Sequence, residues 1–590
     1  MTLTTVIRYP MGNDFNRPHE HPTVNLPDHL DLIAAAPDGI QKLRGLILEL
    51  AVRGKLVPQD PNDEPASELL KRIAKERTRL EAEGAGRKSK ATPLVGEDEQ
   101  PFALPNGWAW VRLGQIGDWG AGATPLRSNF RYYGGTIPWF KSGELTADFI
   151  SDAEEHVTEL ALKECSLRQN RAGDVLIAMY GATIGKTAIL AKAATTNQAV
   201  CACTPNTGVF NRYLLTLLKG LKPNFIGQGA GGAQPNISRE KIIATVTALP
   251  PEAEQHRIVA KVDELMALCD RLEAEQADAG VAHARLVETL LGTLTQSADA
   301  AELAANWQRL AEHFDTLFTT ESSLDALKQT ILQLAVMGKL VPQDPNDEPA
   351  SELLKRIAKE RARLESEGMV KRSKTLPPVG HNEEPFPLPN GWIWERIGNY
   401  VLQTDYGLSE KTFEATEGVP VLKMGDIQAG EVMLGNQKKV PSTTEGLPFL
   451  LLKPDDLLYN RTNSAELVGK TGIFRGPRLQ YSFASYLIRI RCANYLISAY
   501  FLNMAMNAPL FRETEISPHL KQQCGQANVN GTILRNMKVP VPPAAEQHRI
   551  VAKVDELMAL CDRLKADLAE ARTQQERLAT TLIESALNAA

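Results

Sequence analysis

The chain contains the same sequence blocks twice, once in each half. The block from Leu50 to Arg77 returns at Leu334 to Arg361 with a single substitution, at Arg53. A second block, Ala253 to Leu272, returns unchanged at Ala545 to Leu564. A period near half of the 590 residues is too long for a solenoid and indicates two copies of a domain-sized unit. The repeat therefore predicts a duplicated scaffold.

The segments between the repeated blocks have diverged, although they open and close alike. Each begins with Leu-Pro-Asn-Gly-Trp, at Leu104 and at Leu388. Short strand-like runs separated by Gly and Asn follow, and each segment ends in a Pro-Pro pair, at Pro250 and at Pro542. This pattern predicts inserts of α+β type that share a plan and differ in their loops. Two segments that share a framework and differ in their loops are typical of two versions of one recognition domain.

The repeated blocks predict helices with an apolar seam. Apolar residues alternate spacings of four and three, the heptad pattern of helices that pack against a partner helix. This seam comprises Ile258, Val262, Leu265, Cys269 and Leu272 in the first copy, and Ile550, Val554, Leu557, Cys561 and Leu564 in the second. Residues 544–590 contain no Gly or Pro, so one helix of about 65 to 70 Å is expected there. Shorter seam helices are expected at Ile40 to Leu50 and at Leu324 to Leu334, ending near Gly54 and Gly338.

The order of these helices suggests how their seams are covered. Ile40 to Leu50 is expected to pack beside the C-terminal helix, and Leu324 to Leu334 beside Ile258 to Leu272, which would close the two units into a pseudo-twofold ring. The alternative is that the seams bind the helices of another protein.

One segment resembles a phosphate-binding loop and favours a different structure. Gly185-Lys186-Thr187 has Tyr180 where the first glycine of that motif is required, and the matching position before Lys470 is Ser464. An apolar strand-like run follows, where a helix N-terminus would be needed to hold phosphate. We expect a hairpin, and because other catalytic signatures are missing, we expect no chemistry by this chain alone.

Charge distribution points to an acidic partner. The chain carries a net charge of −6, yet the inserts are basic, at about +4 for residues 107–250 and about +3 for residues 391–541. Two basic inserts on an acidic scaffold suit a protein whose inserts face nucleic acid.

The remaining composition predicts a cytoplasmic protein without a metal. No apolar run approaches the roughly 20 residues that span a bilayer, and no signal peptide is apparent. Seven cysteines include no Cys-x-x-Cys pair, which favours reduced, buried thiols. His19 and His21 lie in a Pro- and Asn-rich leader, where a solvated tail is favoured over a metal site.

These motifs together resemble the specificity subunit of Type I restriction-modification systems, in its longer-subunit branch. The residues that carry the resemblance are the openings at Leu104 and Leu388, Gly-Asp-Val-Leu at Gly173, Gln-x-Asn-Ile at Gln234, and Pro-Pro-x-x-Glu-Gln-x-x-Ile at Pro250 and Pro542. The resemblance implies an α+β protein with two α/β target recognition domains separated by long antiparallel coiled-coil helices, in a pseudo-twofold internal repeat. Residues 278–320 and the leader depart from the pattern.

The resemblance also sets the expected domain boundaries. These are a leader at 1–25, an N-terminal helical region at 26–103, a first target recognition domain at 104–250, a central helical region with linker at 251–387, a second target recognition domain at 388–543 and a C-terminal helix at 544–590.

The implied function is recognition of DNA without catalysis. In that family each target recognition domain reads one half of a bipartite, asymmetric sequence from the major groove, and the helices set the spacer and dock partner subunits. Two methyltransferase subunits bring S-adenosylmethionine and methylate adenine, and two restriction subunits use ATP for translocation and cleavage. This chain is then expected to bind no cofactor itself, with S-adenosylmethionine, ATP and Mg²⁺ on its partners. The alternatives are a coiled-coil scaffold without nucleic acid and an autonomous nucleotide-binding enzyme.

Candidate contact residues follow from side-chain chemistry. Arg and Lys suit guanine, and Asn and Gln suit adenine. The DNA-binding candidates are Arg127, Asn129, Arg131, Lys141, Gln234 and Asn236 in the first domain, and Lys423, Asn460, Arg461, Asn463, Lys521, Gln526 and Asn528 in the second. The candidates for helix seam and partner docking are Ile258, Val262, Leu265, Ile550, Val554 and Leu557.

Overall fold

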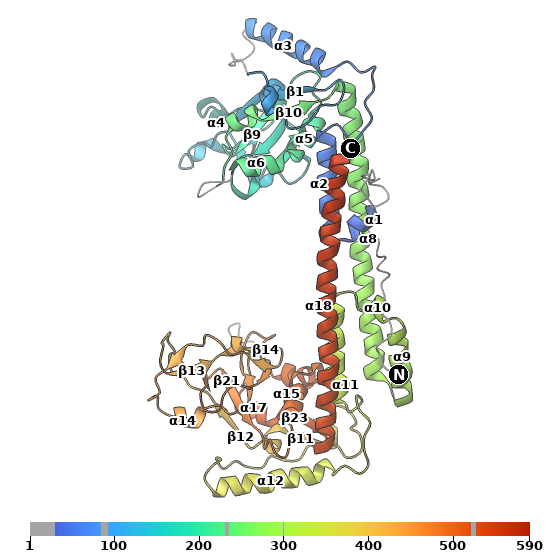
Figure 1. Ribbon diagram of the computed structural model, residues 1–590. Coiled ribbons are helices and arrows are strands. Elements are labelled where there is room, and N and C mark those ends of the chain that lie inside the picture. Colours follow the sequence, from blue (N-terminus) through green and yellow to red (C-terminus); the bar gives the residue numbers. More distant parts are fainter. Residues whose placement is uncertain (1–29, 84–92, 230–234, 299, 521–526, 590) are drawn as a thin grey trace. The chain divides into compact units, whose positions relative to one another are not determined.

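The computed structural model describes residues 30–83, 93–229, 235–298, 300–520 and 527–589 and divides into two compact units. Unit 1 comprises residues up to Asp278 together with those from Ala571, and unit 2 runs from Ala279 to Glu570. Two long helices, α8 (Glu252–Gln296) and α18 (Ala544–Ala589), contribute residues to both units (Figure 1). Within the described ranges, no helix is both long and apolar enough to cross a membrane.

Unit 1 combines short helices with a small mixed insert. Its helices are α1 (Leu30–Ala35), α2 (Gly39–Val52), α3 (Ala66–Ala82), α4 (Glu159–Glu164), α5 (Asn211–Gly220), α6 (Lys222–Gly229) and α7 (Arg239–Ala244). Its strands are β1 (Ala109–Arg112), β2 (Gly117–Ala121), β3 (Tyr133–Phe140), β4 (Phe149–Ile150), β5 (His156–Val157), β6 (Val175–Ala178), β7 (Thr187–Leu190), β8 (Thr195–Thr196), β9 (Val200–Pro205) and β10 (Val246–Leu249). The main sheet has the order β2-β9-β6-β7-β4.

Unit 2 repeats this plan. Its helices are α9 (Ala300–Glu312), α10 (Phe314–Leu317), α11 (Glu321–Val336), α12 (Ala350–Ser366), α13 (Ile397–Tyr400), α14 (Leu447–Leu450), α15 (Ala499–Asn507), α16 (Pro509–Phe511) and α17 (Gly531–Asn536). Its strands are β11 (Ile393–Arg396), β12 (Gln403–Tyr406), β13 (Val419–Leu422), β14 (Ile427–Gln428), β15 (Glu431–Val432), β16 (Lys439–Val440), β17 (Leu457–Asn460), β18 (Thr462–Asn463), β19 (Thr471–Ile473), β20 (Ser482–Phe483), β21 (Leu487–Arg491), β22 (Ala527–Asn528) and β23 (Lys538–Val541). The main sheet has the order β12-β21-β17-β19-β15-β14.

Each insert is closed by pairing of its first and last strands. Ala109 of β1 lies opposite Leu249 of β10, and Ile393 of β11 lies opposite Val541 of β23, both in antiparallel register. The two ends of an insert therefore meet directly before the long helix begins. With helices and sheets in both units, the predicted α+β class is confirmed.

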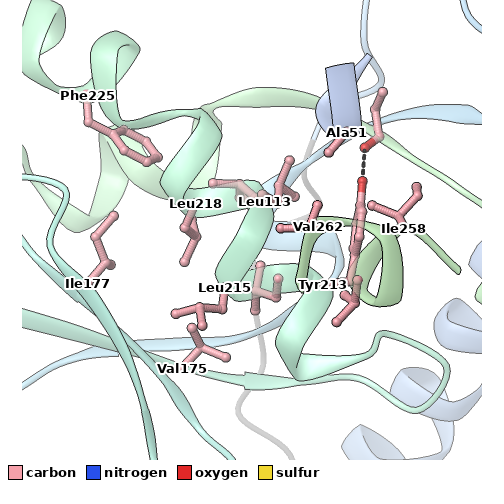
Figure 2. Packing of buried hydrophobic residues seen from close by; sticks show 14 of the residues in the cluster. Ala51, Leu113, Val175, Ile177, Tyr213, Leu215, Leu218, Phe225, Ile258 and Val262 are labelled. Atoms are coloured by element: carbon pink, nitrogen blue, oxygen red, sulfur yellow. Dashed lines mark hydrogen bonds between the residues drawn. The ribbon is translucent and has the colours of Figure 1, made fainter. Parts of the chain in front are cut away.

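The core of unit 1 joins the insert to the helical scaffold. Leu215 of α5 faces Val175 of β6, whereas Tyr213 lies beside Ile258 and Val262 of α8, and all are buried (Figure 2). The Tyr213 hydroxyl donates to the carbonyl of Ala248, at 3.4 Å. One cluster thus holds the sheet, α5 and the seam of the long helix together.

In unit 1 the two long helices run antiparallel, as their contacts with α2 show. In unit 1, Arg44 near the start of α2 pairs with Asp270 of α8 at 2.6 Å, and Gln59 beyond its end reaches Glu254 at 3.3 Å. On α18, Lys42 pairs with Glu576, and Lys55 donates to the Leu587 carbonyl at 2.8 Å. α2 therefore runs antiparallel to α8 and parallel to α18, so α8 and α18 are antiparallel to each other in this unit.

The predicted partner of the second seam helix was wrong. Leu324 to Leu334, in α11, packs with Val287, Leu291 and Leu294 of α8 and with Ile550 and Val554 of α18, not with Ile258 to Leu272. The reason is that α8 continues to Gln296, so unit 2 receives the later part of this helix. The expected packing of Ile40 to Leu50 beside the C-terminal helix is confirmed, because both lie in the core that contains Ala579.

Candidate nucleic-acid interface

In each insert, the segment that follows a central strand lies beside the segment that precedes a short helix. In unit 1, Tyr180 follows β6 and bridges Asn236, and the Ile237 amide donates to the Met179 carbonyl at 2.9 Å. In unit 2, Thr462 pairs with Asn528 in the same way. Of the predicted contact residues, these segments contain Asn236 in unit 1 and Arg461, Asn463 and Asn528 in unit 2, at corresponding places in the two inserts.

The unit 2 segments form a cluster around Tyr406, which we call the Tyr–Arg platform (Tyr406, Arg461 and Asn528). The Arg461 guanidinium lies 4.9 Å from the Tyr406 ring centroid and donates to Asn528 Oδ1 at 3.1 Å. It also donates to the Ser485 carbonyl at 3.3 Å. The Tyr406 hydroxyl accepts from the Gly531 amide at 2.6 Å. Tyr406 remains 46% exposed, so the platform presents an aromatic and a cationic group to solvent.

Two predicted cations of unit 1 bind a carboxylate of their own domain. Arg127 and Lys141 both pair with Glu155, and the Arg127 guanidinium also lies 5.0 Å from the Trp139 ring centroid. The hydrogen bond from Arg127, with a second from Lys141, lowers the pKa of Glu155. Asn129 caps a 3-10 turn by accepting from the Arg131 amide at 3.2 Å. The side chain of Arg131 is exposed.

Asn460, another predicted contact residue, is the last residue of β17 and is buried. It is 1% exposed, its side-chain amide donates to the Leu467 carbonyl at 3.0 Å, and its backbone carbonyl accepts from Gly469. Asn460 therefore shapes the turn that follows β17.

The other second-domain candidates differ in exposure. Lys423 is exposed. Asn463 is half-buried and accepts from the Ser464 amide at 2.8 Å. Gln234, Lys521 and Gln526 lie outside the described residues.

Four of the six seam candidates cannot serve as open docking surfaces. Ile258, Val262, Ile550 and Val554 are at most 6% exposed, because the chain's own cores cover them. Leu265 and Leu557 are half-buried. Each half of the seam thus packs within the core of its own unit.

Unit 1 also contains a cleft of about 650 Å³ that the sequence did not reveal. Its lining includes Gly120, Ala121, Arg168, Tyr180, Gln198 and Arg239. These residues come from β2, from the segments before and after β6, from the loop before β9 and from the start of α7, far apart along the chain. Only strand register relates them, so spacing in the sequence carried no signal.

The loop that resembles a phosphate-binding motif forms a hairpin, as predicted. Val175 of β6 lies opposite Ile189 of β7 in antiparallel register, and Gly185 turns between them with φ of 77°. Gly469 holds the matching turn with φ of 94°. Strands, not helices, follow Lys186 and Lys470, so no helix N-terminus is available there for phosphate.

The described cysteines are buried or half-buried, as the sequence analysis expected. Of the six described cysteines, five are buried and Cys165 is half-buried. Burial raises the pKa of Cys201 to about 12, which keeps that thiol protonated. Among the residues described, no group of His, Cys, Asp or Glu is arranged to hold a metal ion. His19 and His21 lie outside them.

Comparison with known proteins identifies the family. The model for the Type I restriction modification DNA specificity domain matches residues 105–279 and 401–571. The Type I restriction enzyme EcoEI specificity subunit of Escherichia coli is 37% identical over 576 residues, covering 93% of this chain and 94% of its own length. The EcoAI specificity subunit, also of Escherichia coli, is 38% identical over 566 residues, with the same coverage. Two matched domains and relatives that span almost the whole chain confirm the resemblance seen in the sequence, and the chain belongs to the family of Type I restriction-modification DNA specificity subunits.

Proposed function

We propose that each insert reads one half of a bipartite DNA sequence, and that the two halves differ. The observation that supports this most directly is the contrast between equivalent positions of the two sheets. Ala121 and Tyr406 lie opposite equivalent residues, Cys201 and Ile488, on the neighbouring strand. An alanine in one insert and a tyrosine in the other present different chemistry to a base edge. A target read by two such surfaces is not a palindrome.

The contacts proposed for the second half-site centre on the Tyr–Arg platform. Arginine bonds guanine O6 and N7, and asparagine bonds adenine N6 and N7. Arg461 and Asn528 are within hydrogen-bond distance of each other and lie at the edge of the insert. In the first insert Asn236 occupies the position equivalent to Asn528, and it is exposed. Arg131 and Lys423 are exposed cations suited to phosphate contacts.

We also propose that the repeated scaffold docks two methyltransferase subunits, and with them two restriction subunits. α3 and α12 support two equivalent sites, because they carry nearly the same exposed charges at matching places. Lys71 pairs with Glu68 and Lys355 with Glu352, each at 2.7 Å. S-adenosylmethionine, ATP and Mg²⁺ then belong to those partners. We further propose that α18, which at 46 residues is about 69 Å long, fixes the spacer between the half-sites.

The test is to assemble the chain with its methyltransferase partner and to sequence methylated adenines genome-wide. The expected result is one motif with two unlike halves and a fixed spacer. Arg461→Ala should relax the preference in one half only. A motif that stays unchanged at every position would refute base readout by the platform, and methylation without sequence preference would refute the function.

A further inference from the structure

The cleft of unit 1 and the Tyr–Arg platform of unit 2 occupy equivalent positions in the two inserts. Ile488 and Cys201 are equivalent because β17 and β6 pair with them at the same register. Across the sheet, Tyr406 is paired with Ile488, and Ala121 with Cys201. The Thr462–Asn528 pair and the Tyr180–Asn236 bridge match in the same way.

Unit 1 lacks the two large side chains that occupy this position in unit 2. The Tyr406 ring and the Arg461 guanidinium stack there, and the Tyr406 hydroxyl bonds the first amide of α17. In unit 1 the equivalent residues are Ala121 and Met179. A methyl group replaces the tyrosine side chain, and the cleft of about 650 Å³ opens at that place.

The walls of the cleft carry both positively and negatively charged side chains. Arg168 is held in place: it donates to the Asp118 carbonyl and to Thr204 Oγ1, each at 3.0 Å, and pairs with the Asp118 carboxylate. Arg239 is 40% exposed and pairs at 3.2 Å with Glu240 beside it. A backbone hydrogen bond lowers the pKa of Glu240, which keeps this carboxylate charged.

Two further side chains can reach a ligand. The Gln198 carbonyl accepts from the Thr124 hydroxyl, whereas within the described ranges its amide nitrogen makes no hydrogen bond. Gln198 itself is exposed, and Tyr180 is 44% exposed. Both line the cleft.

This balance of charge favours a base edge over a phosphate. Each arginine of the cleft already faces a carboxylate, so the wall offers no net positive charge for an anion. A base edge in the major groove presents donors and acceptors together, which matches arginine, glutamine and glutamate side by side.

We propose that this cleft is the base-reading site of the first insert, with Arg239 and Gln198 as specificity-determining residues. Arg239 is positioned to bond guanine, and Gln198 to bond adenine. The inference rests on the proposed function and refines it, because it assigns readout in unit 1 to residues other than Arg127 and Lys141, which are held by Glu155.

The experiment uses the complex of the chain with its methyltransferase, bound to duplexes randomised across the target. Arg239→Ala and Gln198→Ala should each remove the preference at one base position of one half-site. Affinity for the cognate duplex should fall about 5-fold to 150-fold, the range for loss of one bidentate base contact. Arg171→Ala removes an exposed arginine of the same insert that does not line the cleft; it is the matched control and should change neither property.

A filling variant tests the cleft itself. Ala121→Tyr introduces the residue that unit 2 carries at this position, so the chain should remain folded in a thermal melt. Recognition of the first half-site should be lost, while the second half-site is still read. A folded Ala121→Tyr complex with an unchanged motif would overturn the inference.

Two further results test whether Arg239 contacts a base and whether the cleft is the recognition site. Equal weakening of all sequences by Arg239→Ala, with a shallower salt dependence, would assign Arg239 to phosphate and overturn base readout. Exchange of residues 108–250 for a relative's insert separates this inference from the proposed function. If the exchange changes one half of the motif but the cleft variants do not, only the cleft assignment fails. If the exchange changes nothing, the proposed function fails as well.

Discussion

The hydrogen bond between Trp108 and Glu254 ties the start of the first insert to the start of α8. Trp108 Nε1 donates to Glu254 Oε2 at 3.0 Å, and Gln59 Nε2 approaches Oε1 at 3.3 Å. Glu254 is 1% exposed and Trp108 is 8% exposed, so water cannot replace either partner. A double-mutant cycle of Trp108→Phe and Glu254→Gln should therefore measure a substantial coupling.

The expected magnitude follows from burial. A hydrogen bond to a charged group contributes about 1.5 to 3 kcal/mol, and a buried donor left without an acceptor costs about 1 to 3 kcal/mol. Glu254→Gln retains one side-chain oxygen for two donors, Trp108 and Gln59. We expect a coupling energy of about 1 to 3 kcal/mol between Trp108 and Glu254.

The assay is denaturant unfolding of the intact chain, with any separate transition of unit 1 fitted by itself. The repeat supplies a matched control, because Trp392 donates to Glu546 at 2.9 Å in unit 2. The cycle of Trp392→Phe with Glu546→Gln should give a similar coupling. The crossed cycle of Trp108→Phe with Glu546→Gln should give none, since the two residues share no hydrogen bond. A coupling near zero in both direct cycles, or an equal one in the crossed cycle, would refute the reasoning.

The same carboxylate predicts a pH dependence. Burial raises the pKa of Glu254 above its ordinary value of 4.5. Between the two pKa values the folded state holds a proton that the unfolded state releases. The stabilisation from the protonated Glu254 side chain is therefore fully present below pH 4.5 and is lost as pH rises through the raised pKa of the folded state. Glu254→Gln removes this dependence. Its cost should be larger at about pH 5 than at about pH 7.5, and the opposite trend would contradict the assignment.

Three further predictions concern single residues. Gly54→Ala should lower the free energy of unfolding by at least about 2 kcal/mol, because φ is 69° and the new Cβ would lie 2.6 Å from Pro105 Cγ. Gly45→Ala is the control: its Cβ would meet open space, so the free energy of unfolding should stay unchanged or rise in the same thermal melts. Lys339→Met should cost about 1 to 2 kcal/mol in denaturant unfolding, since Lys339 Nζ donates to the Thr295 and Ser297 carbonyls at 2.8 and 2.9 Å at the C-terminal end of α8. No loss of stability would mean that water replaces both hydrogen bonds. The isolated chain should bind no ATP in equilibrium dialysis, either unaltered or with Lys186→Ala. ATP binding by the unaltered chain that is lost in Lys186→Ala would instead support the alternative of an autonomous nucleotide-binding enzyme.

The helices could be predicted from sequence wherever their signal was local. The heptad seam and the lack of Gly and Pro after Ala544 predicted a helix that the structure places at Ala544–Ala589. α8 was only partly predicted, because Gly280 and Gly292 lie in its later part and no apolar residue larger than alanine continues the seam between Leu272 and Val281. The error in the partner of α11 followed from this shortened helix.

The candidate site could be predicted only in part because side-chain exposure depends on tertiary contacts. Asn460 and Arg461 are neighbours in the sequence, yet one is buried in a turn and the other joins the Tyr–Arg platform. The cleft depends on which residues of β2 and β9 lie opposite one another, and residue types alone do not specify this register. Ala121 carries no functional signal in the sequence, although the small size of its side chain leaves the cleft open.

The most direct test of the central claim is the methylation motif after exchange of residues 108–250 for a relative's insert. The exchanged chain is expressed with its methyltransferase, and methylated adenines are read by single-molecule sequencing. If each insert reads its own half-site, one half of the motif changes, while the other half and the spacer remain. An unchanged motif, or a change in both halves, would contradict the account.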